Sequence, residues 1–567
     1  MDGSKIVNRY DTLKGNLGAF PNRWDILAKY FAPTRYGVTQ GSHVTVGLNV
    51  TREIYDSTGH YAGDVFGNFL ADKIINRANK WFGAGAKNPA IRSNDEVKEW
   101  FEECVDRQLD DYAASNFYTQ ATEMIKDYGV FATGSLFGAE RPYLPTDPPK
   151  FGYRGSHFVC YPIGRYVIAE NAAGEVDTHI CEFKLSARAA VSTFPEGQLP
   201  DDVKKAAQNA DLDKQFDFLY SVSPREYRDR MGKMGAMRMP WTAQYIEKNS
   251  QRIVQESGFS RFEFTTARYG KRWSEYYGRG FGELALNDAQ TLNLAKAMSF
   301  KDWSLKIQPP IVARENSISG KLRMTPSGLT VVNTHGQAIQ NTIMPWQTGS
   351  HPEMSAIKEE ELRQAILQTF YVQHILRLME IEKLPRETTA TTYLNALTLL
   401  YGLLGPIYGA LESEFTRPRV ESDFFRLYSE GVFSPPPDVL LDQGQGQISF
   451  EFQNPLSRAQ RMGELEAIDA GLARLGQIGA AQMQVEQASD VLDWIDIDAT
   501  AKKILDITGV PATCVRSMEQ VLEIRDARSR QQQAAMQQQQ LALMAQSAGQ
   551  AAPMVKALGD MQPQGTA

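Results

Sequence analysis

The stretch ELALNDAQTLNLAKAMSFKDWSLK (283–306) decides the fold prediction, because it reads as one long helix with apolar residues on more than one face. A helix that is apolar nearly all round is expected to be buried by several neighbours. At 1.5 Å per residue this helix would be roughly 36 Å long. Pro309-Pro310 stops it. The stretch therefore predicts a long helix that packs against more than one partner.

The residues after this helix predict a stalk with a β-rich tip. Residues 311–350 read as short strands rich in Val, Ile and Thr with Gly and Asn turns, and a second long helix follows them to about residue 379. A loop at 380–387 comes next, and then a long apolar helix from about Thr388 that is broken at Gly405-Pro406. Two long helices joined by a β insertion form such a stalk.

The part of the chain before the stretch predicts a mixed α+β body. From about 150 to 270 the pattern is mostly short and strand-like, as in a meander. Apolar residues recur at helical spacing in five segments. These are residues 1–32, the residues after DSTG (56–59), those after Asn94, about 116–128, and 186–218, which begins at a Ser186 cap.

The composition places the chain among ordinary globular proteins. Its 567 residues allow three to four domains, and 42% of them are hydrophobic and 22% charged. The formal net charge of −7 argues against a protein that holds nucleic acid by broad phosphate neutralisation. Four cysteines scattered over this length do not form a disulfide scaffold, so we expect reduced thiols in a cytosolic setting.

No motif in the sequence commits the chain to catalysis. DSTG (56–59) lacks the spacing and the second copy of an aspartic-protease triplet, so we interpret it as a helix cap. GVFATGS (129–135) has Ser135 where a phosphate-binding loop needs its lysine, and GRGFG (278–282) is followed by Glu283 where a third glycine belongs. We therefore predict a protein that is not an enzyme and has no cofactor.

One group of residues has the chemistry of a zinc site. His157, Cys160, His179 and Cys181 fall within the predicted meander, and all are ligand types that zinc accepts. On a strand, however, His157 and Cys160 point to opposite faces, and only His179 and Cys181 share one. Ordinary strand residues are the favoured interpretation, so we predict no metal; a zinc-dependent α+β enzyme is the alternative.

A membrane segment is a second alternative. Thr388 to Leu411 contains no charged residue, and its apolar run reaches the length of a membrane span. The glycines and Pro406 dilute its hydrophobicity, and Glu412 and Glu414 follow at once. A kinked helix buried in a large assembly is the favoured interpretation, and the alternative is a membrane-associated structural protein anchored by residues 393–411.

Several strings, taken in order, resemble the head-to-tail connecting (portal) proteins of podovirus-type bacteriophages. They cover nearly the whole chain: YDSTG (55–59) with the pair Trp81-Phe82, YYGRGFGELALNDAQTLN (276–293), TATTYLNALTLLYGLLGPIYGALESEFTRPRVESDF (389–424) and GVPATCVRSMEQVLEIRDAR (509–528). The resemblance implies a mainly helical α+β portal fold. Mapped onto this chain, it implies a wing (1–282), a stem helix (283–310), a β-rich clip (311–352), a second stem helix (353–379), a channel loop (380–387), a kinked long helix returning to the wing (388–454), a crown (455–530), and a Gln/Ala-rich barrel extension or tail (531–567).

The resemblance also implies a function. Portal proteins form a homo-oligomeric ring of about twelve subunits at one capsid vertex, closed by rotational symmetry, and double-stranded DNA is packaged and ejected through its channel. The implied partners are capsid and scaffolding proteins, the large terminase subunit that acts as packaging ATPase, a tail adaptor and internal core proteins, with no membrane. The implied location is the virion, after assembly in the host cytoplasm.

Within this scheme we expect two sets of residues to meet DNA. Lys383 and Arg386 in the channel loop are basic groups that could contact phosphates, although a solvated charge pair is an equal alternative. Glu359, Glu360 and Glu361 on the second stem helix step around it by about 100° each, so only part of this set can face a channel. Those that do would repel phosphate.

Overall fold

The computed structural model describes most of the chain, which divides into two compact units. The first comprises residues 1–83, 104–434 and 450–460, and the second residues 84–103, 435–449 and 461–567. The described residues are 3–37, 53–92, 94–142, 152–209, 211–226, 234–307, 311–313, 336, 338, 343–345, 352–381, 399–400, 402–443, 448–452, 455–486, 494–508, 515–516 and 520–538. The fold mixes helices and sheets, as the α+β prediction has it.

The N-terminal part of the first unit is helical. Its helices are α1 (Gly3–Gly15), α2 (Phe20–Phe31), the 3₁₀ turn η1 (Pro33–Arg35), α3 (Thr58–Ile74) and α6 (Phe117–Phe131), and α5 (Asp95–Ala114) also enters it. The single helix predicted over 1–32 is wrong, because a turn with Gly18 at a φ of 54° separates α1 from α2. A helix begins at DSTG as predicted, but its N-cap residue Ser57 makes no side-chain cap bond; instead, Asp56 Oδ1 accepts a hydrogen bond of 3.0 Å from the Thr58 backbone N–H in the turn that precedes α3.

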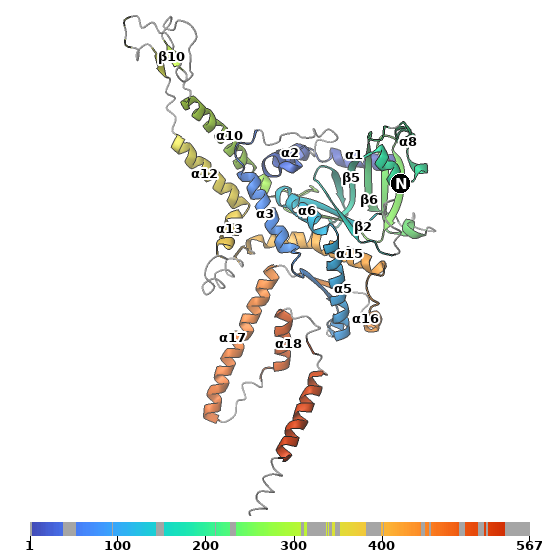
Figure 1. Cartoon of the computed structure of the whole chain (residues 1–567), viewed down its shortest axis with the longest axis vertical. Coiled ribbons are helices and arrows are strands. Elements are labelled where there is room, and N and C mark those ends of the chain that lie inside the picture. The colour runs from blue at the N-terminus through green and yellow to red at the C-terminus, as the bar shows by residue number, and fades with distance from the viewer. Residues whose placement is uncertain are drawn as a thin grey trace, which may run out of the picture. The chain divides into compact units, whose positions relative to one another are not determined.

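Two antiparallel sheets form the rest of the body (Figure 1). A five-stranded sheet has the order β4-β5-β6-β7-β8, and a three-stranded sheet has the order β3-β2-β9. Helices α7 (Ala187–Thr193) and α8 (Asp201–Gln208) bury an apolar cluster against the larger sheet. The strands are β2 (Thr133–Glu140), β3 (Ser156–Tyr161), β4 (Tyr166–Glu170), β5 (Val176–Ser186), β6 (Gln215–Pro224), β7 (Trp241–Glu247), β8 (Arg252–Phe259) and β9 (Phe264–Arg268), with 3₁₀ turns η3 (Glu196–Gln198) and η4 (Gly235–Arg238) between them.

The helix predicted over 186–218 is only partly confirmed. The Ser186 hydroxyl caps α7 by accepting a hydrogen bond of 3.3 Å from the Ala189 backbone N–H. The last residues of that range instead belong to β6, a central strand of the larger sheet. Phe216, Phe218 and Tyr220 alternate with other residues at the period of two that a strand requires. Burial on both faces of β6 obscured this period.

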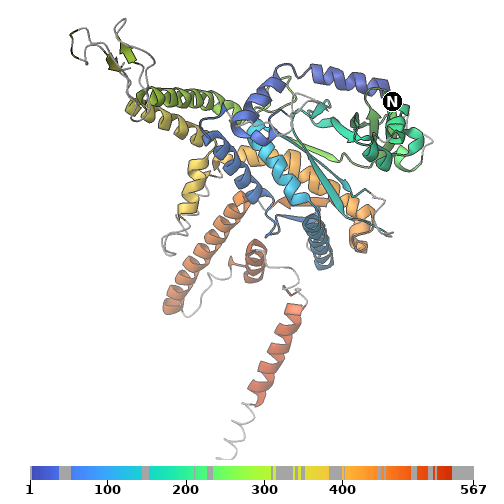
Figure 2. The same ribbon diagram turned by 45° about the horizontal axis from the view of Figure 1, so that its top comes forward.

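The stretch 283–306 lies within helix α10 (Phe281–Ile307), which pairs with α12 (Pro352–Thr369) in a helical hairpin (Figures 1 and 2). Short strands β10 (Ile311–Ala313) and β11 (Ile343–Pro345) pair antiparallel at its tip. The second long helix stops before residue 379, because Tyr371 adopts a φ of 56° and α13 (Val372–Ile381) begins after it.

A further long helix crosses the first unit after residue 398. Residues 399–411 are helical wherever they are described, and a π-helical turn, η5 (Glu412–Thr416), joins them to α15 (Arg417–Ser429). The expected break at Gly405-Pro406 is wrong, since the irregular turn lies at η5. Strands β1 (Phe82–Ala86) and β12 (Ile448–Phe452) form a separate two-stranded sheet.

The described part of the second unit is mainly helical, and it also holds parts of strands β1 and β12. It contains α4 (Pro89–Arg92), α16 (Asp438–Gln443), α17 (Pro455–Glu486), α18 (Ile497–Thr508) and helical residues 520–538. The sequence predicts helix throughout 455–530, and α17, α18 and the start of the last helix fall in this range. The described residues of the second unit contain no group of three or more His, Cys, Asp or Glu side chains that could hold a metal ion, and the candidate residues Glu359, Glu360 and Glu361 belong to the first unit.

Candidate functional site

Polar side chains lie at the centre of the contact between α10 and α12, which we call the inner seam of the hairpin. Glu359 on α12 is only 4% exposed and accepts hydrogen bonds from the Lys296 ammonium at 2.9 Å and the Ser299 hydroxyl at 2.6 Å. Burial raises the pKa of Glu359, but these bonds outweigh it and hold the pKa below its ordinary value. The charged seam fixes the register of the two helices, because a shift by one residue would leave a buried carboxylate unpaired.

A short segment before α3, residues 53–56, connects the hairpin to the body; we call it the strap. The side-chain amide of Asn293 bonds the backbone on both sides of the strap, accepting from the Tyr55 N–H at 2.7 Å and donating to the Glu53 carbonyl at 3.1 Å. Arg363 on α12 holds Asp56 with two hydrogen bonds of 3.0 and 2.9 Å. The Asp of the DSTG sequence therefore serves both as a turn former and as an anchor for the hairpin.

The opposite side of α10 carries an apolar stripe that the described residues leave exposed. We call Leu284, Leu294, Met298 and Leu305 the outer stripe; they are 69%, 56%, 58% and 41% exposed. At about 100° per residue, the stripe lies opposite the buried residues of the same helix, which include Ala285, Ala289 and Leu292. Helix α10 is thus apolar on two opposite sides; α12, α2 and α6 pack against the helix, and Trp303 and Ile307 near its end remain exposed on the side opposite the stripe.

The three acidic candidates on α12 have different surroundings. Glu359 lies in the inner seam, as described above. Glu360 and Glu361 are exposed, and each forms an ion pair along the same helix, Glu360 with Arg363 at 3.2 Å and Glu361 with Lys358 at 2.7 Å. The basic candidates Lys383 and Arg386 lie outside the described residues. Of the five predicted residues, Glu360 and Glu361 are those that the structure places on the surface.

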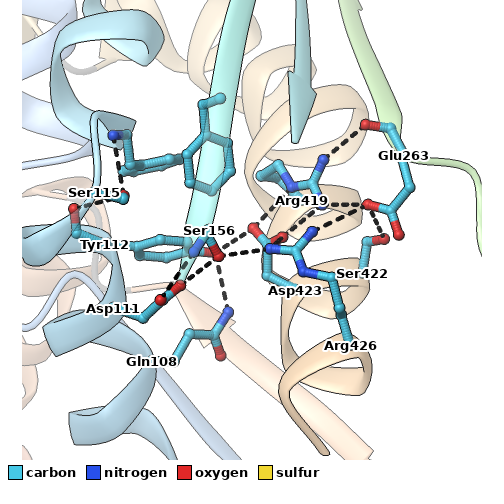
Figure 3. Close-up of polar contacts among 12 residues, drawn as sticks. Gln108, Asp111, Tyr112, Ser115, Ser156, Glu263, Arg419, Ser422, Asp423 and Arg426 are labelled. Carbon is cyan, nitrogen blue, oxygen red and sulfur yellow. Dashed lines mark hydrogen bonds and ion pairs between the residues drawn. The ribbon is translucent and has the colours of Figure 1, made fainter. Parts of the chain in front are cut away.

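A buried polar network fastens α15 to the body (Figure 3). Arg419 is fully buried and donates to both carboxylate oxygens of Asp423, at 2.8 and 2.6 Å, and to the Glu263 carboxylate at 2.8 Å. Asp423 also accepts a 2.8 Å hydrogen bond from the Tyr112 hydroxyl of α5. Arg426 joins the network through Asp423 and donates to the Ser156 hydroxyl of β3 at 2.8 Å. These bonds link α15 to α5 and to the three-stranded sheet.

This network was not predicted from the sequence. The only signal is the pair Arg419 and Asp423 at the i, i+4 spacing that brings side chains together on a helix. The same spacing is common on solvated helix faces. Burial of these charges depends on Glu263 and Tyr112, which are far away in the sequence.

The four residues considered as zinc ligands, His157, Cys160, His179 and Cys181, lie on strands β3 and β5. His179 stacks on Phe264 with ring centroids 3.8 Å apart, and its Nε2 lies 3.0 Å from the Ser135 hydroxyl. Burial lowers the pKa of His179 to about 3. The Cys181 thiol donates to the Tyr220 carbonyl. Within the described parts of the chain, no three His, Cys, Asp or Glu side chains come together as metal ligands.

The glycines of GRGFG (278–282) allow backbones to approach closely. Ala132 ends α6 with a φ of 55°, and a side chain at Gly278 would clash with its carbonyl oxygen. The Gly278 N–H also donates to the Thr133 hydroxyl at 2.8 Å. The motif therefore packs the start of α10 onto the body, in agreement with its failure as a dinucleotide-binding sequence.

The sequence of this chain is similar to those of known bacteriophage proteins. Residues 4–515 match the family model described as "Bacteriophage head to tail connecting protein". The chain belongs to this family. The portal protein of Salmonella phage epsilon15 is 25% identical to this connector protein over 554 residues, which cover 97% of this chain and 94% of the relative. A protein described as a probable portal protein of Bordetella phage BPP-1 has the same identity and coverage over 555 residues.

This connector protein is therefore a structural component of the phage particle and not an enzyme. A solved chain from the virion of a native gene transfer agent particle covers 78% of this chain and 94% of its own, with 13% identity and a TM-score of 0.33, which is too low to support a structural argument. No helix among the described residues is long and apolar enough to cross a membrane, and the membrane-anchored alternative is not favoured.

Proposed function

We propose that this connector protein assembles into a closed ring of about twelve subunits at one capsid vertex. Double-stranded DNA would enter the capsid through the ring during packaging and leave through it into the tail. The packaging ATPase, the large terminase subunit, and later a tail adaptor would dock on it in turn, with capsid, scaffolding and internal core proteins on the other side. Family membership and the uncovered outer stripe of α10 support this proposal.

The exposed outer stripe of α10 is the main structural support for ring assembly. A soluble chain rarely leaves a helix apolar on a side that faces water. In a ring, each hairpin lies between two identical neighbours, and a head-to-tail contact repeats until the rotation closes. The outer stripe of one subunit would then pack on the hairpin of the next.

The long helix before η5 gives independent support. Leu400, Leu404 and Leu411 are buried in the chain, whereas Leu399 and Leu403 on a neighbouring side of the helix are exposed. The described residues between 399 and 411 include no charged side chain that would favour water on the exposed side. Cover by another subunit would complete its burial.

We assign the parts of the chain to the portal architecture as follows. The body up to residue 282 is the wing, α10 and α12 are the stem, and β10 and β11 belong to the clip that faces the motor and then the tail. Residues 380–387 form the channel loop, 388–454 the long helix and its return to the wing, 455–530 the crown, and 531–567 a barrel extension or tail. The α10–α12 hairpin with β strands at its tip supports the stem and clip assignment.

The outer side of α12 is the face that we assign to the channel. Ile357, Glu361, Gln364 and Gln368 recur there at helical spacing, and three of the four are polar. Glu360 lies beside them. A wall with carboxylates and amides repels phosphate weakly and forms no lasting contact with it, which suits a conduit for a polyanion. Lys383 and Arg386 of the channel loop remain our candidates for transient phosphate contacts.

A charge placed on the outer stripe tests ring assembly. We expect Leu294→Glu and Met298→Glu to shift the protein from rings to single subunits, because each would bury an unpaired carboxylate between copies. Ser304→Glu is the matched control, since Ser304 is exposed on α10 outside the stripe. Native mass spectrometry reports the distribution. Equal ring populations in all three variants would contradict the proposed interface.

A further inference from the structure

The long helix that spans η5 is fastened in different ways on its two sides. Downstream of η5, α15 is held by the buried ion network of Arg419, Asp423 and Arg426 (Figure 3). Upstream, residues 402–411 pack mainly through apolar side chains such as Leu404, Ile407 and Leu411, and the Tyr128 hydroxyl donates to the Ile407 carbonyl at 3.2 Å. Breaking the network would leave buried charges unpaired, whereas apolar contacts can slide. α15 is the fixed side of η5, and residues 402–411 are the side that can move.

The turn between these sides is held open by an ion pair. A π-helical turn contains one residue more than an α-helical turn, and such turns are frequent at functional sites. Glu414 within η5 accepts hydrogen bonds from the Arg268 backbone N–H at 2.7 Å and from its guanidinium at 2.8 Å. Arg268 ends β9, and its side chain is only 4% exposed. Glu414 thereby links the π-helical turn to the end of this strand.

A small cavity borders the same turn. It has a volume of about 20 Å³ and is lined by Ile74, Trp81, Tyr408, Glu412, Thr416 and Phe452. This volume suffices for a single water molecule. Three of these residues belong to η5 or to the helix just before it. A cavity beside a widened turn gives its backbone room to rearrange, which a close-packed helix interior would deny.

We infer that η5 is a hinge in the long helix and that the Glu414–Arg268 pair is the latch that holds it in the observed conformation. When the pair opens, residues 402–411 change their angle to α15 while the ion network keeps α15 in place. The inference goes beyond the connector function, because it concerns motion within one subunit. It is also independent of ring size and of DNA.

Removing the extra residue tests the hinge. Ser413 is exposed, and its side chain bonds only the Ala410 carbonyl among the described contacts. Deletion of Ser413 from the full-length protein would turn η5 into a regular α-helical turn and keep the buried sides of both flanking segments in register. We expect hydrogen exchange in residues 402–411 to slow about tenfold, because local opening loses its hinge. Ser413→Ala keeps the five-residue turn and should exchange like the parent protein.

Removing the latch tests the second half of the inference. Glu414→Gln keeps the size of the side chain and loses the charge that strengthens its bonds to Arg268. We expect exchange in residues 402–411 to rise about tenfold and exchange in α15 to stay unchanged. Glu430→Gln, at an exposed glutamate just after α15, is the control.

Two outcomes would overturn the inference. One is the same exchange in residues 402–411 for the Glu414→Gln variant and its control. The other is equal acceleration in residues 402–411 and in α15, which would show general loosening instead of a hinge. If the Ser413 deletion prevents folding, the Glu414→Gln comparison decides alone. Either result leaves the proposed connector function standing, because ring formation is measured separately.

Discussion

At the scale of single residues, buried polar groups distinguish this body from a plain apolar core. Arg419 and Asp423 are completely buried, and each is paired. A buried ion pair adds little net stability compared with apolar packing, but breaking it leaves a charge without a partner. His179 shows a second solution, because it stays neutral between Phe264 and Ser135. Both arrangements tie together segments that are distant in the sequence.

Arg419→Met should therefore cost much more than a surface substitution. We expect the free energy of unfolding to fall by about 3–5 kcal/mol, because two buried carboxylates, Asp423 and Glu263, would be left with Arg426 alone to balance them. Arg417→Met is the matched control on the same helix; Arg417 is 42% exposed and pairs with Glu412, so a loss of about 0–1 kcal/mol is expected. Urea denaturation measures both, and similar losses would contradict the importance of burial.

His179 should make the protein sensitive to acid. Its pKa is about 3 in the folded protein and 6.5 ordinarily, so the unfolded chain takes up a proton first as the pH falls. Its contribution to stability is complete above pH 6.5 and is lost as the pH falls toward 3. Between pH 5.5 and 4.5 the parent should lose about 1.4 kcal/mol more than His179→Gln. Parallel pH profiles of the two proteins would contradict this account.

At the scale of elements, the local sequence pattern predicted those helices and caps whose formation depends on neighbouring residues in the chain. Helix α10, the Ser186 cap and the helix start at DSTG follow from spacing within one segment. Strand β6 and the break at Tyr371 could not be predicted, because each depends on packing: β6 is buried on both faces, and Phe370, next to Tyr371, packs against Phe66 and Phe281. The same holds for Glu359, whose partners are on the other helix of the hairpin.

The inner seam of the hairpin can be tested through Glu359. Glu359→Gln should reduce the local stability of the hairpin by about 1–3 kcal/mol, because the bonds from Lys296 and Ser299 lose their charge. Glu361→Gln, two residues further on and exposed, should change it by less than about 0.5 kcal/mol. Hydrogen exchange in α10 and α12 measures the difference. Equal protection in the two variants would refute a role for the buried pair.

At the scale of the whole molecule, the negative charge of the chain acquires a role. A net charge of −7 excludes a broad basic grip on DNA, and a ring multiplies this charge by its number of subunits. Tight phosphate neutralisation would slow a sliding polyanion. An acidic wall with few basic groups would let DNA pass in both directions without holding it.

Charge reversal on α12 tests this account of DNA passage. We expect Glu360→Lys and Glu361→Lys to slow packaging or ejection and to leave ring assembly intact, because new basic groups would bind phosphate in the channel. The effect should weaken as salt rises. Glu430→Lys is the control, an exposed glutamate outside the hairpin. Unchanged DNA transit in the two α12 variants would argue against a channel-facing position.

The most direct test of the central proposal is a view of the purified full-length protein along its assembly axis by electron microscopy. The proposal predicts a closed ring of about twelve subunits around an open channel, with the α10–α12 hairpins side by side and the outer stripe of each covered by its neighbour. A stable single subunit, an open filament, or a ring that leaves the outer stripe exposed to solvent would contradict it.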